Sequence, residues 1–337
     1  MAEGNEDQIA TISDVAAAAG VSKTTVSHVL SGRRPVSEVT RAKVLSVIEE
    51  LGFKQNFFAA GLSGSSSKTI ALVVQDLTNP FYPALARGLQ QVVGERDYVV
   101  LLADVGAGTP PIEVFLAQTV QRRVDGVVVA AVDVRDAELK PLQKAGIAVV
   151  TVGSPRHGTT TDQVSADDHQ IARDAVTHLC EQGHELIATI TGPALVAPGS
   201  SRLAGYREGL KQNKRSASRT RVVQGDWTVA SGAKAMAKLM RLPQRPSAVF
   251  CANDLMAIGA IETAVALGLS VPEDVAVIGV DDIDAAGLIR PALSTVRIPA
   301  QEIGLVAGEL VLARIDGADG PQQQLLVPHN LVIRESA

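Results

Sequence analysis

The sequence predicts a small all-α headpiece followed by a larger α/β body built on parallel sheets. Residues 12–30 have the pattern of two short helices joined by a tight turn. From Thr69 onward, short aliphatic runs alternate with amphipathic segments, a pattern typical of parallel strands covered by helices on both faces. The length of 337 residues exceeds that of one ordinary domain, so the chain can hold both parts.

The first two predicted helices carry cap and turn signals. Ser13 and Ser22 can each accept hydrogen bonds from the free N–H groups of a first helical turn. Gly20 supplies the permissive backbone that the turn requires. Five apolar side chains are spaced to meet between the helices: Ala16, Ala19, Val21, Val26 and Val29. We therefore predict a helix-turn-helix, whose second helix fits the major groove of B-DNA.

The second helix predicts a face that contacts DNA. Six polar residues lie at its start and along it: Ser22, Lys23, Thr24, Thr25, Ser27 and His28. In such helices the N-terminal residues meet base edges. The plainer alternative is a helical hairpin with a solvated polar face, and the segments that follow argue against it.

A third helix and a second DNA-suited segment follow. Ser37 can cap this helix, and Gly52 can close it; its apolar positions are 44, 47, 48 and 51. Residues 56–64 have the pattern of a short helix on a serine-rich tether, which would be marginal alone in water. We divide the chain into a headpiece at 1–56, a hinge helix and linker at 57–68, and a body at 69–337.

The formal net charge of −5 is unusual for a protein that binds DNA. Between residues 8 and 68, however, seven basic side chains stand against four acidic ones. This local basic excess is modest. Specific contacts and dimerisation must therefore add to the attraction of phosphates.

The body contains seven candidate buried strands and five clear helical stretches between them. The strands fall at 70–74, 99–103, 126–130, 149–152, 186–190, 248–251 and 275–280. The helices fall at 84–93, 112–122, 172–180, 202–210 and 255–267. These are too many units for one compact sheet.

Residues 12–64 resemble the headpiece and hinge of the lactose-repressor (LacI/GalR) family of bacterial transcriptional regulators. The resemblance implies that Lys23, Thr24 and His28 read operator bases, and it places Asn56 in the DNA-binding set. It also implies that Leu62 wedges into the minor groove and kinks the DNA. A homodimer is expected, because two headpieces would read the two halves of a pseudo-palindromic operator.

The same resemblance implies a periplasmic-binding-protein-like (type I) body. Two similar lobes would enclose a ligand cleft, and the chain would cross between them three times. The first lobe would take about 69–162 and a return near 293–324. A ligand in the cleft would control DNA binding by shifting the lobes between two arrangements.

Six residues near strand ends match the effector-binding positions of this family: Asn79, Phe81, Arg202, Trp227, Asn253 and Asp281. Such side chains suit a sugar, because arginine and aspartate can each bind neighbouring hydroxyls and an indole stacks on the C–H face of a pyranose. Each of these residues could also have a purely structural role. Trp227 could be a core or surface anchor, Arg202 and Asp281 a structural ion pair, and Asn79 and Asn253 helix caps.

An enzyme and a sugar-binding transport receptor are the competing classes. The loop at 106–111 follows a strand but lacks the third glycine of a dinucleotide-binding motif. The acidic turn at 281–284 is isolated, and the histidines show no metal-ligand spacing. We therefore expect no catalytic set, no metal and no cofactor. The DNA-binding headpiece argues against a transport receptor.

Location and assembly follow from apolar patterning and from the end of the sequence. We find no apolar run long enough to span a bilayer and no secretory leader, so we expect a cytoplasmic protein with no membrane contact. Cys180 and Cys251 are expected to be buried thiols. The stretch after Pro328 is too short for the tail helix by which some relatives form tetramers. Effector identity, and whether effector releases or recruits DNA, stay open.

Overall fold

A computed structural model of the chain describes residues 10–31, 34–53, 66–106, 111–130, 134–153, 160–193 and 197–337. The chain divides into two compact units, residues 1–68 and 69–337. Each unit has a hydrophobic core of its own.

The first unit contains three helices, α1 (Ile12–Ala19), α2 (Lys23–Ser31) and α3 (Glu38–Glu50). Their buried side chains form one small aliphatic core: Val15, Ala16, Ala19, Val26, Val29, Val44 and Val47. The predicted helix-turn-helix is therefore confirmed. Its turn uses Gly20 in the left-handed region, with φ +63°.

The caps of these helices match two of three predictions. Ser22 Oγ accepts the N–H of Thr25 at 3.1 Å, and Ser37 Oγ accepts the N–H of Thr40 at 3.3 Å. The prediction for Ser13 is wrong, because α1 begins at Ile12. Thr11 precedes this helix, and its N–H donates to Asp14 Oδ2 at 2.8 Å.

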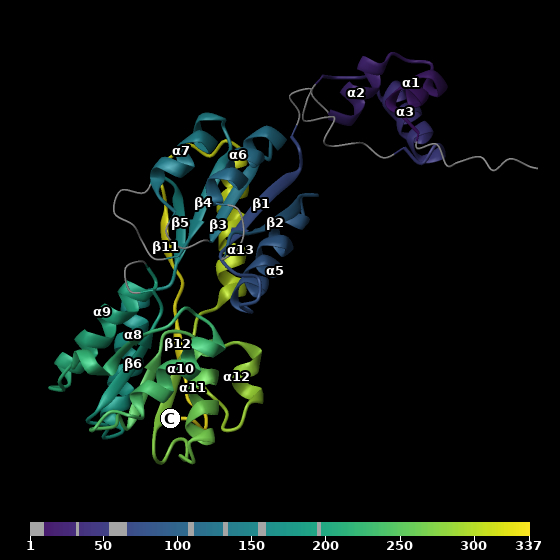
Figure 1. Cartoon of the computed structure of the whole chain (residues 1–337). Helices are drawn as coiled ribbons and strands as arrows, with labels where there is room; N and C mark the ends of the chain where they lie inside the picture. Colours follow the sequence, from purple (N-terminus) through teal and green to yellow (C-terminus); the bar gives the residue numbers. More distant parts are fainter. Residues whose placement is uncertain are drawn as a thin grey trace, which may run out of the picture. The chain divides into compact units, whose positions relative to one another are not determined.

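The second unit consists of two α/β lobes (Figure 1). The sheet of lobe 1 has the order β11-β5-β4-β3-β1-β2, and every pair of neighbours is parallel. Its strands are β1 (Thr69–Val74), β2 (Val99–Asp104), β3 (Gly126–Ala130), β4 (Ala148–Val152), β5 (Asp162–Ser165) and β11 (Gln324–Leu326). Its helices are α5 (Phe81–Gly94), α6 (Ile112–Arg122), α7 (Asp136–Lys144) and α13 (Ala300–Ile315).

Lobe 2 repeats this plan with the order β12-β10-β9-β8-β6-β7. Its strands are β6 (Ile187–Thr191), β7 (Val222–Gln224), β8 (Ala248–Cys251), β9 (Ala276–Asp281), β10 (Ser294–Arg297) and β12 (Asn330–Val332). Its helices are α8 (Asp168–Glu181), α9 (Gly199–Gln212), the short 3-10 helix η1 (Arg219–Arg221), α10 (Val229–Leu239), α11 (Asp254–Ala266) and α12 (Asp284–Leu288). One edge strand, β12, runs antiparallel to β10. The expectation of parallel sheets thus holds for all other pairs.

The chain passes between the lobes at 166–167, 298–299 and 327–329. The predicted return to lobe 1 at 293 comes too early, because β10 still pairs with β9 in the sheet of lobe 2. On that return α13 packs along α5, more than 200 residues distant in sequence (Figure 1). The contact is close, since a Cβ added to Gly304 would lie 2.1 Å from the carbonyl oxygen of Leu85.

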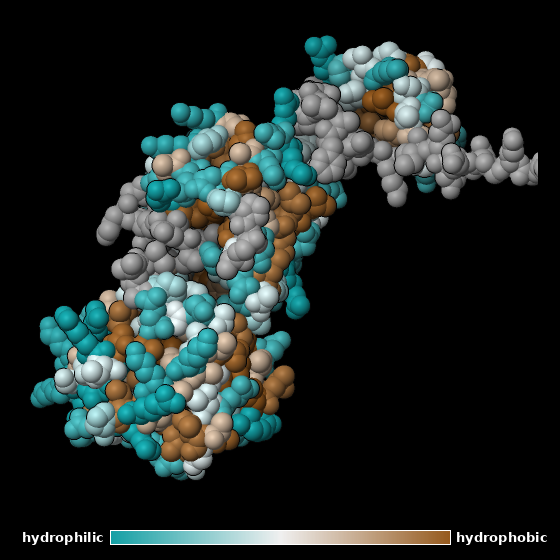
Figure 2. All heavy atoms as spheres, viewed as in Figure 1, coloured by the Kyte–Doolittle hydropathy of each residue, from teal (hydrophilic) through white to brown (hydrophobic). Residues whose placement is uncertain are grey.

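The surface of the second unit carries both hydrophilic and apolar side chains. Figure 2 shows mostly hydrophilic side chains, with apolar patches on both lobes. Among the helices in the described ranges, none combines the length and the apolar character that crossing a membrane requires.

Candidate functional site

The recognition helix α2 has the polar face that the sequence predicts. Lys23, Thr24 and Ser27 are exposed, and His28 is half-buried. On the opposite side Val26 and Val29 are buried in the core of the first unit. Ser22 and Thr25 hydrogen-bond each other through their hydroxyls at 2.9 Å and fix the first turn of the helix. The predicted DNA contacts Asn56 and Leu62 lie outside the described residues.

A cavity of about 570 Å³ lies between the two lobes of the second unit. Its polar wall is built from residues that follow the carboxyl ends of strands, such as Asp76 after β1, Asp104 at the end of β2 and Asp226 after β7. Parallel α/β sheets bind ligands at this edge, where neighbouring loops diverge. All six predicted effector residues line the cavity: Asn79, Phe81, Arg202, Trp227, Asn253 and Asp281.

The lobe 1 wall contains the loop that leads from β1 into α5. Asp76 Oδ1 accepts the N–H of Thr78 at 2.8 Å, and Asn79 Oδ1 accepts the N–H of Phe81 at 3.0 Å. Asn79 thus binds the first N–H group of α5, although the N-cap position itself is occupied by Pro80. Phe81 and Tyr82 meet edge to face with ring centroids 5.4 Å apart and form an aromatic corner of the cavity.

In the lobe 2 wall Arg202 is bound to Asp168. Its Nε and Nη2 both lie 2.8 Å from Asp168 Oδ1, and its Nη1 donates to the carbonyl oxygen of Ala252. Both side chains of the pair are buried. The structural alternative considered for Arg202 was an ion pair with Asp281, whereas the structure pairs it with Asp168.

Asp281 is a buried carboxylate at the end of β9. Burial raises its pKa to about 7, the nearby Arg202 lowers it in part, and the charge of Asp168 raises it. Asp281 and Asp282 both have positive φ, +119° and +60°, which is strained for residues other than glycine. The strain is held in place because Asp282 forms ion pairs with Arg297 and Arg334, both at 2.6 Å.

Asp254 is a second buried carboxyl group of lobe 2, at the start of α11. It accepts hydrogen bonds from the hydroxyl of Thr295 at 2.5 Å and from the N–H of Ile283 at 3.0 Å. Burial and the charge of Asp281 raise its pKa. Burial and the charge of Asp281 also raise the pKa of Tyr82, which lies across the cavity in lobe 1.

Trp227 extends into the cavity from the loop between β7 and α10. Asn253 is 1% exposed, and both of its polar atoms meet the protein. Its Nδ2 donates to the carbonyl oxygen of Trp227 at 3.0 Å, and its Oδ1 accepts the N–H of Met256 at 3.0 Å. The cap interpretation of Asn253 is therefore confirmed.

The described lining of the cavity is acidic. Its charged members are six aspartates and Arg202, the aspartates being Asp76, Asp104, Asp136, Asp168, Asp226 and Asp281. Apolar side chains, among them Val134, Leu139 and Ile303, complete the wall. Sequence reasoning missed Asp168 and Tyr82, although the pair Asp167-Asp168 at a helix start and the run Phe81-Tyr82 were available as signals.

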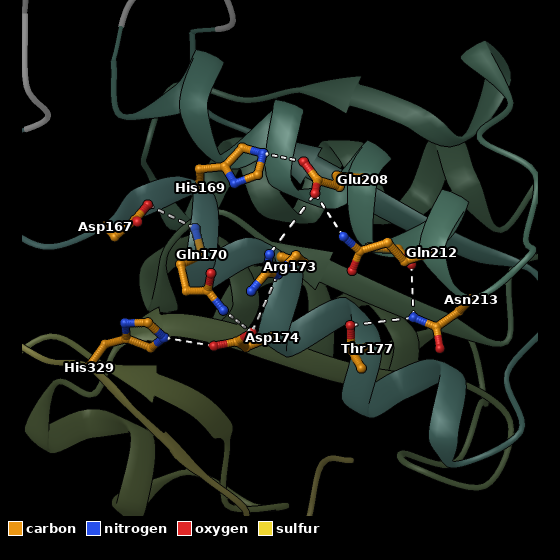
Figure 3. A network of polar contacts seen from close by, with 11 residues as sticks. Asp167, His169, Gln170, Arg173, Asp174, Thr177, Glu208, Gln212, Asn213 and His329 are labelled. Atoms are coloured by element: carbon orange, nitrogen blue, oxygen red, sulfur yellow. Dashed lines mark hydrogen bonds and ion pairs between the residues drawn. The ribbon is translucent and has the colours of Figure 1, made fainter.

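A polar network ties the third crossover to α8 (Figure 3). His329 Nε2 lies 3.0 Å from Asp174 Oδ2, and Gln170 Nε2 donates to the other oxygen of Asp174 at 2.6 Å. One turn away, His169 Nε2 lies 3.0 Å from Glu208 Oε2 and so joins α8 to α9. Across the described ranges, no group of three or more histidine, cysteine or acidic side chains is arranged to hold a metal ion.

A helical DNA-suited headpiece joined to a two-lobed body with a ligand cleft defines the class of ligand-controlled DNA-binding regulators. The model of bacterial regulatory proteins of the lacI family matches residues 11–56, and that of the periplasmic binding protein-like domain matches residues 176–337. The ribose operon repressor of Escherichia coli (strain K12) is 35% identical over 98% of this chain and 100% of its own length. The chain belongs to the lacI family.

Solved structures agree with this assignment. A complex of the transcriptional regulator CelR with cellobiose aligns with a TM-score of 0.73 and 34% identity, over 97% of this chain and 100% of that one. The lac repressor dimer bound to operator and the anti-inducer ONPF aligns with a TM-score of 0.85 and 25% identity, over 98% and 99%. These relatives are regulators, in contrast to the enzyme and transport-receptor alternatives.

Proposed function

We propose that this protein is a transcriptional repressor that binds a pseudo-palindromic operator as a homodimer, under the control of a small uncharged sugar in the cleft between its lobes. The cleft carries this proposal, because all six residues selected from the sequence line one cavity of about 570 Å³. That volume falls within the range of small-molecule sites. As a regulator of bacterial genes the protein would act in the cytoplasm.

The chemistry of the cleft supports a neutral polyol. A carboxylate such as Asp281 accepts hydrogen bonds from hydroxyl groups, and the indole of Trp227 offers a flat apolar face to a sugar ring. The guanidinium of Arg202 is already neutralised by Asp168 at 2.8 Å. The described lining therefore favours hydroxyl groups over phosphate or carboxylate groups.

The two related structures support the type of ligand and the assembly. One contains cellobiose and the other is a dimer on operator DNA. Apolar side chains exposed on the second unit offer surface to a partner copy, with Val99 58%, Val265 52% and Leu288 77% exposed.

In the headpiece, the exposed residues Lys23, Thr24 and Ser27 support base reading by α2. We propose the same for His28, with Ser22 and Thr25 at the start of the helix. Asn56 and Leu62 complete the proposed DNA-binding set, with Leu62 in the minor groove.

Two measurements test the proposal. Selection from a random DNA library should return an inverted repeat, because a symmetric dimer reads two equal half-sites. Titration with a panel of sugars that includes ribose and cellobiose should change the emission of Trp227, the single tryptophan of the chain.

The sign of control follows from operator affinity with and without the active sugar. A sugar that weakens operator binding acts as an inducer, and one that strengthens it acts as a corepressor. A protein that selects no DNA repeat and responds to no sugar or other neutral polyol would contradict the proposal.

A further inference from the structure

The indole of Trp227 rests directly on the backbone of Gly192. A Cβ added to Gly192 would lie 2.0 Å from Cζ2 and 2.2 Å from Cη2 of the indole ring. Non-bonded carbon atoms do not approach so closely, so a side chain at position 192 would push the ring away. Gly192 directly follows β6. The loop between β7 and α10, which carries Trp227 and is called the tryptophan loop below, is bound to the end of β6, because the N–H of Gly225 donates to the carbonyl oxygen of Thr191 at 2.7 Å.

The backbone of Trp227 is held in an unfavourable conformation. Its φ of +74° lies in the left-handed region, which a bulky residue occupies only when its surroundings impose it. The Nδ2 of Asn253 donates to the carbonyl oxygen of Trp227 itself, at 3.0 Å. On the other side, Asp226 Oδ1 accepts the N–H of Thr228 at 3.2 Å and its hydroxyl at 2.6 Å.

Asn253 is anchored at its other end as well. Its Oδ1 caps α11 by accepting the N–H of Met256, and the side chain is 99% buried. An anchored amide is a fixed donor, and it therefore sets the position of the tryptophan loop relative to α11. The contact runs between two elements of lobe 2, so it does not require contact between the lobes.

We propose that Gly192 and Asn253 are positioning residues that set the plane of the Trp227 indole in the cleft. Gly192 provides the bare backbone on which the ring lies, and Asn253 fixes the left-handed backbone that directs the ring there. Through this contact Asn253 acts on a ligand by way of Trp227. The role of the ring as a stacking surface rests on the proposed function, whereas its position does not.

The first test is the Gly192→Ala variant, measured without ligand. Emission from the chain's single tryptophan should shift, and acrylamide should quench it more strongly than in the wild type, because the methyl group displaces the ring. Gly287→Ala is the matched control, since nothing lies within 4 Å of a Cβ at that position. Emission and quenching equal to the wild type in Gly192→Ala would overturn the proposal.

A double variant separates ring displacement from general damage. The clashing atoms belong to the six-membered part of the indole, which a phenylalanine at 227 places differently and with less bulk. In the Trp227→Phe background, Gly192→Ala should therefore shift the urea midpoint less than it does in the wild type. An equal shift in both backgrounds would show that Gly192 does not act through Trp227.

The second test is Asn253→Ser. Serine keeps an oxygen for the helix cap but is too short to reach the carbonyl of Trp227. Helix content should stay as in the wild type, while acrylamide quenching of Trp227 rises. Wild-type quenching in Asn253→Ser would overturn the role assigned to Asn253.

Sugar titration then links ring position to binding. For ribose or cellobiose, whichever perturbs the wild type, Gly192→Ala and Asn253→Ser should each weaken affinity about 3- to 10-fold, the range expected for one aromatic contact. Wild-type affinity in both variants would overturn the link. If neither sugar changes the Trp227 emission of the wild type, that result contradicts the proposed function. The quenching measurements still test the position of the ring in that case.

Discussion

Arg202 and Asp168 form a buried ion pair in which two nitrogen atoms of one guanidinium, Nε and Nη2, contact a single carboxylate oxygen at 2.8 Å. The pair joins the start of α8 to α9, directly after the first crossover between the lobes. Both residues line the cleft, so the contact that shapes this part of its wall also holds two helices of lobe 2 together.

Removing one member of this pair should be costly. Asp168→Ala leaves the Arg202 charge buried without its partner, and we expect the free energy of unfolding to fall by about 3–5 kcal/mol in urea titrations. Glu185→Ala is the control, because Glu185 is 76% exposed and lies 3.6 Å from Arg215. Its loss should cost less than about 1 kcal/mol. Similar losses in both variants would contradict this account.

The raised pKa of Asp281 predicts a pH dependence of stability. Between about pH 4 and 7 the folded protein binds more protons at this carboxyl than the unfolded chain does, so its contribution to stability falls as pH rises. Asp281→Asn removes the titrating group. The variant should exceed the wild type at pH 8 by on the order of 1–4 kcal/mol and match it near pH 4. Thermal melts at pH 4, 6 and 8 would detect this, and a gap independent of pH would refute it.

The recognition face predicts a change in DNA sequence preference. Lys23→Ala should relax the consensus at one position in each half-site, with a loss of discrimination of about 1–3 kcal/mol. Arg41→Ala removes the same charge from α3 and should weaken all sequences alike. Selection from a random DNA library distinguishes the two outcomes, and an unaltered consensus for Lys23→Ala would remove Lys23 from base reading.

The contact of α5 with α13 predicts an effect of overpacking. Gly304→Ala places a Cβ 2.1 Å from the carbonyl oxygen of Leu85, so the two helices must separate. We expect a loss of about 1–3 kcal/mol in the free energy of unfolding. Gly287→Ala has open space and should change it by less than about 0.5 kcal/mol. A tolerated alanine at 304 would show that the helices adjust without cost.

The sequence predicted the central strands well because they are continuous aliphatic runs. β1, for example, is buried at all six positions and reads Thr-Ile-Ala-Leu-Val-Val. The strand β5, which lies between β4 and the edge strand β11, has no such signal. It contains the buried Asp162, which Arg314 binds through two nitrogens at 2.7 and 2.9 Å. Burial raises the pKa of Asp162, but this contact holds it below the usual value.

Six residues that line the cavity were selected from the sequence by type and place, but the contacts among the lining residues were not predicted. Asp162 and Arg314 lie far apart in the sequence, and so do Asp168 and Arg202. The spacing of apolar residues within one segment cannot predict such pairs. The left-handed backbone at Trp227 was likewise unpredictable, because its carbonyl is bound by Asn253 from a different element. Caps, by contrast, are local, and the error at Ser13 amounts to two residues.

The insertion of lobe 2 within the sequence of lobe 1 has a consequence for biosynthesis. The face of α5 that carries Leu85 and Leu89 is covered by α13, which the ribosome makes about 200 residues later. At translation rates of about 5–20 residues per second, that face waits about 10–40 s for its partner. Throughout this interval a nascent chain with a finished headpiece still displays an open apolar groove. We therefore expect the need for chaperones during synthesis to depend on the connectivity of the lobes, and not only on how stable the completed protein is.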